Sequence, residues 1–411
     1  MEKLRILIVH NAYKIPGGED SVVANELQLL RDAGHEVFLY QKNNTEMESY
    51  SLFQKLSLPF RSIYSRKTYR EVRALIKEQH IDLVHVHNTL FVISPSVYDA
   101  ARSLGVPIVQ TIHNYRLLCP NALLLRDGRI CQDCLSHGLR QSVKHACYRG
   151  SRSQTLIVSL MLGYHRRRGT YSRLSYICLT DFNKNMLLRL SLRGRPLLSP
   201  DQIYVKPNFT ADPGTPVPYN ERQPYFLFAS RMDTSKGIFI LLQAWEHYEQ
   251  SAACPKELIL CSTGPEEDAV HGYIQTHALS HVTILGQLPH EEILIKMKYA
   301  LAVCLPTQWY EGFPVVIAES FACGTPVIGS NIGNVGSLVK HGETGLTHAP
   351  TDVDTLADFF LHWDPASNDV QAMSSNARKA YEDAYTPEKN LELLSEIYQN
   401  VLIKNKHNTE D

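Results

Sequence analysis

The chain has 411 residues, 44% of them hydrophobic, and a formal net charge of −1. This length predicts two or three domains, and the composition predicts a globular protein with a sizeable core. Because the chain is nearly neutral, we expect no nucleic-acid partner. The sequence shows no signal peptide and no run of about 18 apolar residues, which predicts a cytoplasmic protein without a transmembrane helix. For a protein in that compartment, we expect that the nine cysteines do not form a disulfide scaffold.

Strand and helix patterns alternate through the first half of the chain. A helix at about 20–33 and helical segments at 47–80 lie among apolar runs that predict strands, at 4–9, 36–40, 82–87, 106–111, 176–179 and 203–206. This alternation is typical of a parallel sheet, in which ligands bind beyond the carboxyl ends of the strands. The second strand ends in Gln41 and Lys42 and no G-x-G-x-x-G follows the first, which argues against a dinucleotide-dependent oxidoreductase.

Glycines and histidines lie at these predicted strand ends. Gly17 and Gly18 follow the first strand, where they would let a phosphate approach the backbone or would form a plain turn. His85, His87 and His113 lie near the ends of later strands, and a histidine in such a place can be structural or functional.

Four cysteines form a C-x11-C-x2-C-x12-C pattern, whose central C-x2-C is compatible with a tetrahedral zinc site. The ligands would be Cys119, Cys131, Cys134 and Cys147. His137 or His145 could replace one of them. Four thiolates would leave no open coordination position, so such a zinc would be structural. The alternative is an irregular insertion, about 119–173, whose thiols pack as small buried side chains.

The same region is strongly basic. There is no Asp or Glu between Cys134 and Thr180, and an apolar run at 156–162 lies among eight cations: Arg140, Lys144, Arg149, Arg152, Arg166, Arg167, Arg168 and Arg173. Cations beside a short apolar run are typical of a surface that rests on anionic lipid. A groove for an acidic acceptor, or a solvated face, would have a similar composition.

A segment with four prolines, 211–224, is predicted to link the two halves. Arg231 and Lys236 lie in the loop after the first strand of the second half, where two cations can converge on one anion such as a diphosphate or can be ordinary surface charges. The strands of this half are predicted at 225–229, 258–261, 282–285, 301–305 and 325–328.

Two acids flank a predicted helix start in the second half. Glu311 lies just before the helix, and Glu319 is the one acid inside its apolar sequence. Pro314 occupies the expected first helical position, which tolerates proline. A carboxylate inside an apolar helix needs a polar partner, for which a pair of ligand hydroxyls would serve. The alternative is a structural capping acid followed by a half-exposed helix acid.

These acids stand in P-x4-E-G-F-P-x4-E-x2-A-x-G-x-P-V, which resembles the E-x7-E segment of retaining GT-B glycosyltransferases of family 4. The resemblance extends over nearly the whole chain, and R-x4-K at Arg231 and Lys236 matches the family's diphosphate clamp. The family more often has Gly where this chain has Pro314. The resemblance implies the GT-B fold, an α/β architecture of two doubly wound Rossmann-like domains facing each other across a cleft.

The resemblance also implies roles for individual residues. Four take catalytic roles: Glu311 would contact hydroxyls of the transferred sugar, His113 would lie near an outer hydroxyl of that sugar, and Arg231 and Lys236 would neutralise the diphosphate. Glu319 would bind the ribose. The remaining donor-binding positions lie in the matching loops and at the helix start: Gly17, Gly18, Gly264, Gln287, Leu288, Gly312, Phe313, Pro314 and Val315.

The implied function is transfer of a sugar from a nucleotide diphosphate sugar to an acceptor hydroxyl, with retention and without a catalytic cofactor. We expect an acceptor domain at 1–207, a linker at 208–224, a donor domain at 225–384 and a returning helix and tail at 385–411. The basic surface, with a second at 61–77, predicts peripheral binding to an anionic membrane and a lipid-linked glycan acceptor in cell-surface polysaccharide or lipopolysaccharide synthesis. Alternatives are a GT-B epimerase, a pyridoxal-dependent phosphorylase and a non-catalytic sugar-nucleotide-binding protein.

Overall fold

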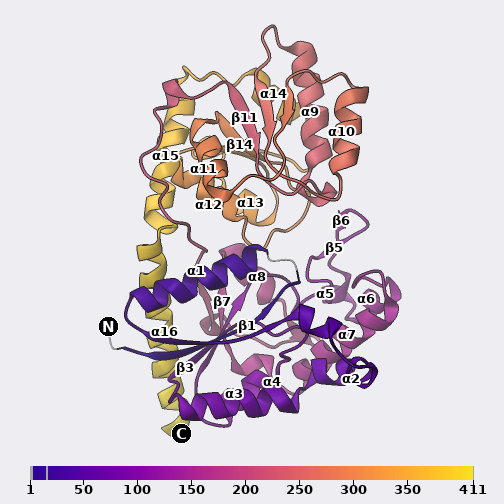
Figure 1. Ribbon diagram of the computed structural model, residues 1–411, viewed down its shortest axis with the longest axis vertical. Helices are drawn as coiled ribbons and strands as arrows, with labels where there is room; N and C mark the ends of the chain where they lie inside the picture. The colour runs from indigo at the N-terminus through magenta and orange to yellow at the C-terminus, as the bar shows by residue number, and fades with distance from the viewer. Residues whose placement is uncertain (1–2, 15–16, 411) are drawn as a thin grey trace. The chain divides into compact units, whose positions relative to one another are not determined.

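The computed structural model describes residues 3–14 and 17–410, and the chain divides into two compact α/β units (Figure 1). Unit 1 comprises Met1–Leu124, Cys131–Pro207 and Asn390–Asp411. Unit 2 comprises Leu125–Ile130 and Asn208–Lys389. The chain therefore leaves unit 1 after Pro207 and returns to it at Asn390. The short segment 125–130 groups with unit 2, which differs from the predicted boundary.

Unit 1 is built on a parallel sheet. Its strands are β1 (Arg5–Ala12), β2 (Glu36–Asn43), β3 (Leu83–Asn88), β4 (Ile108–Ile112), β7 (Ser175–Cys178) and β10 (Ile203–Val205). They lie in the order β10-β7-β4-β3-β1-β2, and every neighbouring pair is parallel. The six strands predicted in this half are therefore confirmed.

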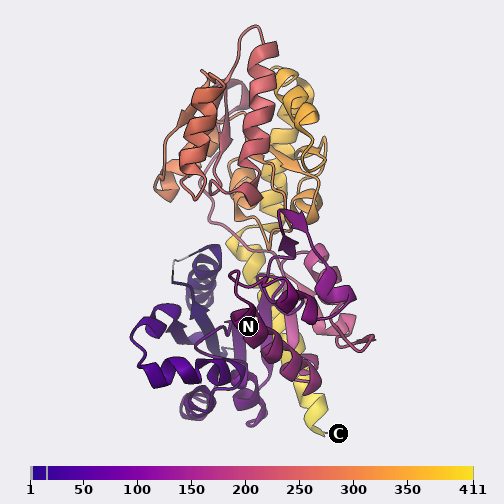
Figure 2. The ribbon, with the colours of Figure 1, turned by 90° about the vertical axis from the view of Figure 1, so that its right-hand side faces the viewer.

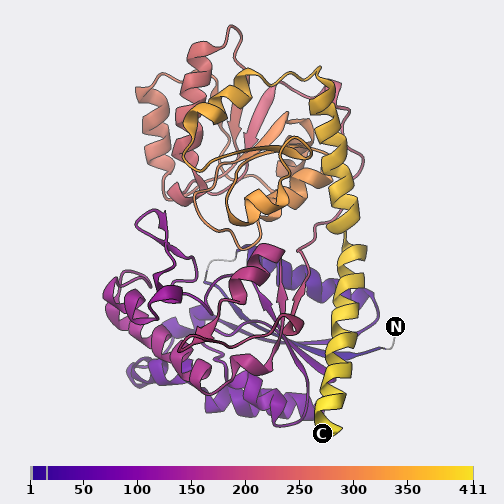
Figure 3. The same cartoon turned by 180° about the vertical axis from the view of Figure 1, so that it is seen from behind.

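Helices cover both faces of this sheet (Figures 1 and 2). They are α1 (Gly18–Asp32), α2 (Leu52–Ile63), α3 (Arg66–Glu78), α4 (Ser96–Arg102), α5 (Asp133–Ser136), α6 (Arg140–Lys144), α7 (Arg152–Arg167), α8 (Asp181–Leu187) and the C-terminal α16 (Pro387–Glu410). Leu394, Ile397 and Tyr398 of α16 pack against Ile6 and Ile8 of β1, so the end of the chain completes this core (Figure 3).

Unit 2 repeats the architecture. Its strands are β11 (Tyr225–Phe228), β12 (Glu257–Leu260), β13 (Val282–Ile284), β14 (Ala302–Leu305), β15 (Val327–Ser330) and β16 (Gly345–His348). They are parallel in the order β13-β12-β11-β14-β15-β16. The helices are α9 (Ile238–Ser251), α10 (Glu267–Thr276), α11 (His290–Tyr299), α12 (Val315–Ala322), α13 (Gly333–Leu338), α14 (Val353–Leu361) and α15 (Asn368–Ala384).

Short elements complete the chain. Two small antiparallel hairpins are β5 (Leu125–Arg126) with β6 (Arg129–Ile130), and β8 (Ser191–Leu192) with β9 (Arg195–Pro196). The 3-10 helices are η1 (Asn44–Glu48), η2 (Tyr171–Arg173), η3 (Pro200–Gln202), η4 (Tyr219–Glu221) and η5 (Thr234–Lys236). Within the described residues, no helix is both long and apolar enough to span a membrane.

Both faces of the second sheet are buried, which explains why its strands are continuous apolar runs. Phe226 of β11 packs on one face with Trp245 of α9, whereas Leu227 packs on the other face with Phe321 of α12. A strand that is covered on both sides has no position for a polar side chain in its middle. Polar residues are therefore placed beyond the strand ends.

The strand order determines at which strand ends a ligand can bind. In unit 2 the chain turns in opposite directions after β11 and β14, and in unit 1 after β1 and β3. At such a switch point the two connections diverge and leave a crevice at the carboxyl edge of the sheet, where ligands bind in doubly wound folds.

One detail of α12 corrects the sequence prediction. Pro314 is not the first helical residue but the residue before it, with φ −76° and ψ 95°, and Val315 begins the helix. Gly324 follows the helix end with φ +66°, where a left-handed residue closes the last turn.

Arg222 joins several segments of unit 2. Its guanidinium donates to the carbonyl oxygens of Ala300, Cys323 and Gly324 at 2.9, 3.2 and 2.9 Å and to Thr325 Oγ1 at 2.7 Å. Burial lowers the pKa of Arg222 to about 10. The planar, five-donor guanidinium satisfies the carbonyl groups at the end of α12, which a single ammonium cannot match.

We predict that Arg222→Lys destabilises unit 2 by about 2–3 kcal/mol, because it leaves buried acceptors without donors. Urea unfolding followed by tryptophan fluorescence would measure the loss, since Trp245 and Trp363 lie in the core of unit 2. Arg195→Lys, at an exposed position in β9, is the control. An Arg222→Lys unfolding curve that overlays the wild-type curve would contradict the prediction.

Candidate active site

The loop after β11 brings cations to the switch point of unit 2. Asp233 Oδ1 accepts from Ser235 N at 2.9 Å and begins the 3-10 turn that carries Lys236. Gly237 follows with φ +75°, and a Cβ there would lie 1.8 Å from the carbonyl oxygen of Pro306. The loops after β11 and β14 are thus packed backbone to backbone, a close approach that only glycine permits.

Arg231 and Lys236 occupy different environments in this loop. The side chain of Arg231 is 65% exposed and donates to Asp233 Oδ2 at 2.8 Å. The Lys236 side chain is 21% exposed, and its Nζ lies 2.7 Å from Glu311 Oε1. Burial alone would raise the pKa of Asp233. Hydrogen bonds from Ser235 and the charges of Arg231 and Lys236 outweigh burial and hold that pKa below its usual range.

Glu311 is a buried, paired carboxylate and not an exposed capping acid. The residue is 5% exposed. Its Oε1 accepts from Lys236 Nζ at 2.7 Å, from Thr307 Oγ1 at 3.0 Å and from Trp309 Nε1 at 3.0 Å. Asn334 Nδ2 donates to the backbone carbonyls of Glu311 and Gly312, at 2.6 Å each, which holds the loop before α12. Thr307, Trp309 and Asn334 were not identified from the sequence.

Glu319 lies on the second turn of α12 with a different partner. Its Oε1 is 2.8 Å from Nε2 of His290, the first residue of α11. That hydrogen bond raises the pKa of His290. The loop before His290 holds Gln287, which is exposed, and Leu288, which packs into the core of unit 2. Of the two predicted contacts in this loop, Gln287 is exposed and Leu288 is half-buried, and both stay predictions.

Three other predicted donor positions of unit 2 are partly buried or lie at a close loop contact. Gly264 lies where a Cβ would be 2.2 Å from the carbonyl oxygen of Met232, so it lets the loops after β11 and β12 meet. Phe313 is half-buried against the core, with its ring 6.1 Å from that of Tyr385. Val315 is half-buried at the first turn of α12.

In unit 1, Gly17 and Gly18 form the N-terminus of α1. Gly17 precedes the helix, and its N–H donates to Asp20 Oδ2 at 2.9 Å. Both glycines are exposed, and no described atom lies within 4 Å of where their Cβ atoms would be. Backbone N–H groups at an open helix N-terminus suit an anion. The two residues before Gly17 lie outside the described residues.

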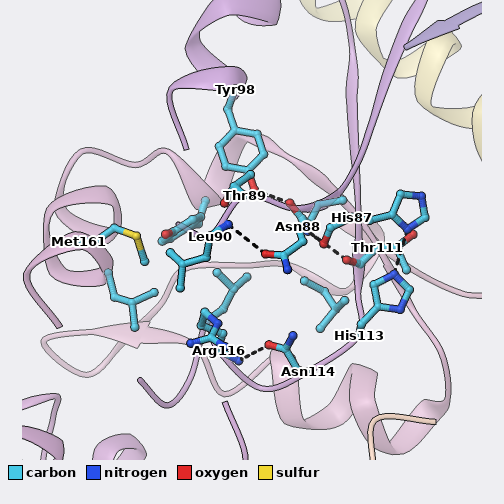
Figure 4. Close-up of a pocket in the computed structure, with 15 residues that line it drawn as sticks. His87, Asn88, Thr89, Leu90, Tyr98, Thr111, His113, Asn114, Arg116 and Met161 are labelled. Atoms are coloured by element: carbon cyan, nitrogen blue, oxygen red, sulfur yellow. Dashed lines mark hydrogen bonds between the residues drawn. The ribbon is translucent and has the colours of Figure 1, made fainter. Parts of the chain in front are cut away.

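The three histidines differ in their surroundings. His113 follows β4 and lines a pocket with His87, Asn88 and Asn114 (Figure 4). Its Nε2 lies 2.9 Å from His87 Nδ1. Burial holds the pKa of His113 well below its usual value, which favours the neutral ring. His85 is structural, since its Nδ1 and Nε2 lie 2.7 Å from hydroxyl groups of Tyr398 and Thr111.

A buried charge behind these histidines escaped the sequence analysis. Glu26 of α1 is fully buried, with Oε1 3.4 Å from His87 Nε2 and Oε2 2.9 Å from Lys206 Nζ. The signal was present, because Glu26 lies on the helix face that also buries Val22 and Leu30.

Glu26, His85 and His87 also form the one group of three metal-ligating side chains found among the described residues. The Lys206 ammonium already neutralises the carboxylate of this group. A dication would have to lie beside that ammonium, so these residues do not suit a metal.

The predicted zinc cysteines divide into a close pair and two further residues. Cys119 Sγ interacts with the Cys134 thiol, and both side chains are buried. Within the described part of the chain, the four cysteines do not provide three sulfurs within 4.8 Å of one another. Cys131 and Cys147 are half-buried. A structural zinc at these residues stays a prediction.

Comparisons with known proteins match both units. The family models "Glycosyl transferases group 1" and "Glycosyltransferase Family 4" match residues 216–380 and 16–144. Glycogen synthase of Mycobacterium tuberculosis is 32% identical over 146 residues, which cover 34% of this chain and 35% of that protein. O-antigen chain mannosyltransferase B of Escherichia coli is 30% identical over 141 residues, 34% of this chain and 36% of that protein.

The aligned segments thus span about a third of the length of these two relatives. The crystal structure of Anabaena Alr3699/HepE in complex with UDP aligns over 96% of this chain and 100% of that one, with a TM-score of 0.65 and 16% identity. This likeness confirms the predicted GT-B fold. Unit 1 is thus similar to the family 4 model and unit 2 to the group 1 model, and the chain has the GT-B fold of the solved structure.

Proposed function

We propose that this protein transfers a sugar from a nucleotide diphosphate sugar to an acceptor hydroxyl with retention at the anomeric carbon. The pairing of Lys236 with buried Glu311 at the unit 2 switch point carries the proposal. A diphosphate can replace the carboxylate as the partner of Lys236, and the carboxylate can then accept a hydroxyl of the transferred sugar. The UDP bound to Alr3699/HepE supports a nucleotide donor.

The proposed chemistry relies on charge stabilisation by the protein. The bond between the anomeric carbon and the diphosphate oxygen breaks, and the acceptor oxygen bonds to that carbon on the same face. Arg231, Lys236 and the N-terminus of α12 offset the charge that develops on the leaving diphosphate. A diphosphate oxygen takes the acceptor proton. These cations would make a metal at the diphosphate unnecessary.

We predict that Arg231→Ala weakens UDP binding by about 10- to 100-fold and leaves uridine binding unchanged, because a charge-assisted hydrogen bond to the diphosphate is lost. Thermal shifts with UDP, GDP, ADP and the nucleosides would measure this and identify the base. Arg231 is the better variant, since Lys236→Ala would strand the buried Glu311. Lys340→Ala, beyond α13 at the opposite edge of the sheet, is the control.

Equal losses for UDP and uridine in Arg231→Ala would contradict the clamp. A wild-type protein that binds none of the nucleotides would contradict the function. Release of free nucleoside diphosphate without any acceptor-dependent transfer would favour the epimerase reading.

We predict that substitutions of Glu311 and of Glu319 change different kinetic parameters. Glu311→Gln should lower kcat with little change in donor KM, because its carboxylate acts on the moving sugar as charge develops. Glu319→Gln should mainly raise donor KM, since a ribose contact is present before and during the reaction. Steady-state kinetics would measure both, with His290→Asn as a control that removes the partner of Glu319 and keeps its carboxylate. Full turnover with a raised KM in Glu311→Gln would contradict the assignment.

The surface that we expect to bind the acceptor lies on unit 1. The predicted basic surface is only partly exposed. Arg166 is buried and donates to a main-chain carbonyl, so it does not belong to this surface, and the expectation was wrong for that residue. Arg168 is exposed but pairs with Asp99 at 2.9 Å. In the apolar run of α7, some residues are buried, whereas Leu156 and Leu160 are exposed.

Helix α2 supplies a stronger apolar face, which the sequence analysis did not identify. Leu52, Phe53, Leu56 and Phe60 are 76%, 82%, 68% and 75% exposed. The helix packs against α7, so the exposed apolar residues of the two helices belong to one region of unit 1 (Figure 1). Exposed cations lie on α3, which follows α2 in the chain, and on α7: Arg66, Lys67, Arg70, Arg152 and Arg167.

We propose that this region rests on an anionic membrane at its cytoplasmic face and that the acceptor is a lipid-linked glycan. A large exposed apolar face accompanied by cations fits lipid, because each cation near an anionic surface contributes about 1 kcal/mol. The similarity to an O-antigen mannosyltransferase supports a role in surface polysaccharide synthesis.

We predict that the protein sediments with anionic vesicles at low salt and is released at high salt. Phe53→Ser together with Phe60→Ser should weaken this binding at least about tenfold, since each buried phenyl ring contributes about 1.5–3 kcal/mol. Ile295→Ser, which changes an exposed apolar residue of unit 2, is the matched control. Unchanged sedimentation of the double variant, or full transfer to a water-soluble acceptor without vesicle binding, would contradict the membrane proposal.

A further inference from the structure

A groove in unit 1 is lined by cations. It has a volume of about 630 Å³ and is formed by α5, α6, α7 and the hairpin of β8 and β9, where the three helices pack on one another (Figure 1). Its cationic lining residues are Arg140, Arg166, Arg167, Arg189 and Arg193. None of the lining residues that the structure describes is Asp or Glu. Cations grouped in this way repel one another, so an anion in the groove would be bound favourably.

Arg166 is the buried member of this set. The residue is 8% exposed. Among the described residues, only Nη2 of its guanidinium has hydrogen-bond partners, the carbonyl oxygens of Leu117 and Leu118. Its Nε is buried and has no partner within the described part of the chain. Because a buried donor without an acceptor is costly, this nitrogen indicates a ligand that brings acceptor oxygens into the groove.

The described residues supply no carboxylate for these five cations, none of which lies within 4 Å of an Asp or Glu oxygen. Arg189 donates to the side-chain oxygen of Gln132 at 2.7 Å instead. One lining group can become an anion, the Cys134 thiol, and its hydrogen bond with Cys119 lowers its pKa. A thiolate there would offset one charge of five. Most of the positive charge is left for a ligand, and guanidinium groups suit the oxygens of phosphate.

The same groove also has apolar walls. Leu156 and Leu160 of α7 line it and are 45% and 52% exposed. Helix α7 packs against α2, whose exposed apolar face belongs to the region that we propose to rest on a membrane. A free phosphate would leave these leucines in water, whereas a phosphate that carries an apolar chain would cover them. The lining therefore suits an anion attached to a lipid.

We propose that this groove is a binding site for a lipid diphosphate, the head of the lipid-linked acceptor. The inference rests on the proposed function, in which such an acceptor is used at a membrane surface. A diphosphate ester carries more negative charge than a phospholipid head and can contact the buried Arg166 and the exposed arginines at the same time. The apolar walls favour it over free diphosphate.

The site is tested with farnesyl diphosphate, added below its micelle concentration to the full-length protein. Saturating UDP occupies Arg231 and Lys236, so that the probe does not bind there. In calorimetric titrations, farnesyl diphosphate should bind at least about tenfold more tightly than inorganic diphosphate, because the farnesyl chain covers the exposed leucines. Farnesol and soluble dihexanoyl phosphatidylglycerol should bind at least about tenfold more weakly than farnesyl diphosphate, because they carry less negative charge. Equal affinity for any two of these probes and farnesyl diphosphate, or no binding of farnesyl diphosphate, would overturn the proposal.

Variants of the arginines locate the binding. Arg140→Glu together with Arg193→Glu should weaken farnesyl diphosphate binding at least about tenfold, because two exposed attractions become repulsions. Arg195→Glu is the matched control, since it reverses an exposed charge of the same hairpin outside the groove, and it should change the affinity less than about twofold. Arg166→Lys keeps a charge but removes Nε, and should weaken binding about 3- to 10-fold. Unchanged affinity in either groove variant would overturn the proposal.

Failure of the proposed function would give a different pattern. UDP, GDP and ADP would then cause no thermal shift, while farnesyl diphosphate would still bind and Arg140→Glu with Arg193→Glu would still weaken it. If the groove proposal alone fails, a nucleotide shifts the melting temperature of the wild type and of the double variant equally, and farnesyl diphosphate binds to both alike or to neither.

Discussion

Burial of both faces of each parallel sheet is the constraint on which the rest of the structure depends. A strand covered on both sides has no room for an unpaired polar side chain: β11, β14 and β15 consist of buried, mostly apolar residues, and the buried His85 of β3 is paired with Tyr398 and Thr111. Chemistry is therefore confined to the loops at the carboxyl edge. In unit 2, the R-x4-K loop and the loop before α12 begin on the two sides of the point where the strand order reverses, and they contact each other through Gly237 and Pro306. The fold thus determines where the charged groups of the candidate site meet.

The buried charges of both units obey one rule: each has a partner from a distant part of the chain. Glu26 and Lys206 are 180 residues apart in sequence, and Lys236 and Glu311 are 75 apart. No acid among the described residues pairs with Arg222, which is instead surrounded by carbonyl oxygens. Since removing one partner leaves an uncompensated buried group, such pairs oppose any rearrangement of the elements that supply them. They hold the histidines and acids of the candidate site in fixed positions.

Features that depend on residues close together in the sequence were predicted better than features that depend on residues far apart. Strand positions depend on local apolar runs, and the predicted strands were found to within a few residues; β16, a short strand with two half-buried residues, was missed. Glu311 and Glu319 stood out because an acid in an apolar segment is conspicuous. Their partners did not. Trp309 is only two residues from Glu311, but the sequence does not indicate that its indole N–H turns toward that carboxylate, and His290 becomes a neighbour of Glu319 only through the packing of α11 against α12. The exposure of α2 was equally hidden, because its apolar residues could have faced the core.

The Lys236–Glu311 contact also affects how the site treats small anions. In the absence of a donor, the ammonium already has a counter-ion, and this carboxylate is tethered to the same protein at a high effective concentration. An incoming anion must displace it. Inorganic phosphate or chloride would have little besides Lys236 to bind, whereas a diphosphate can contact Arg231 and the N-terminus of α12 at the same time. Under the proposed function, this internal counter-ion would favour ligands with more than one negatively charged group over simple anions such as inorganic phosphate or chloride.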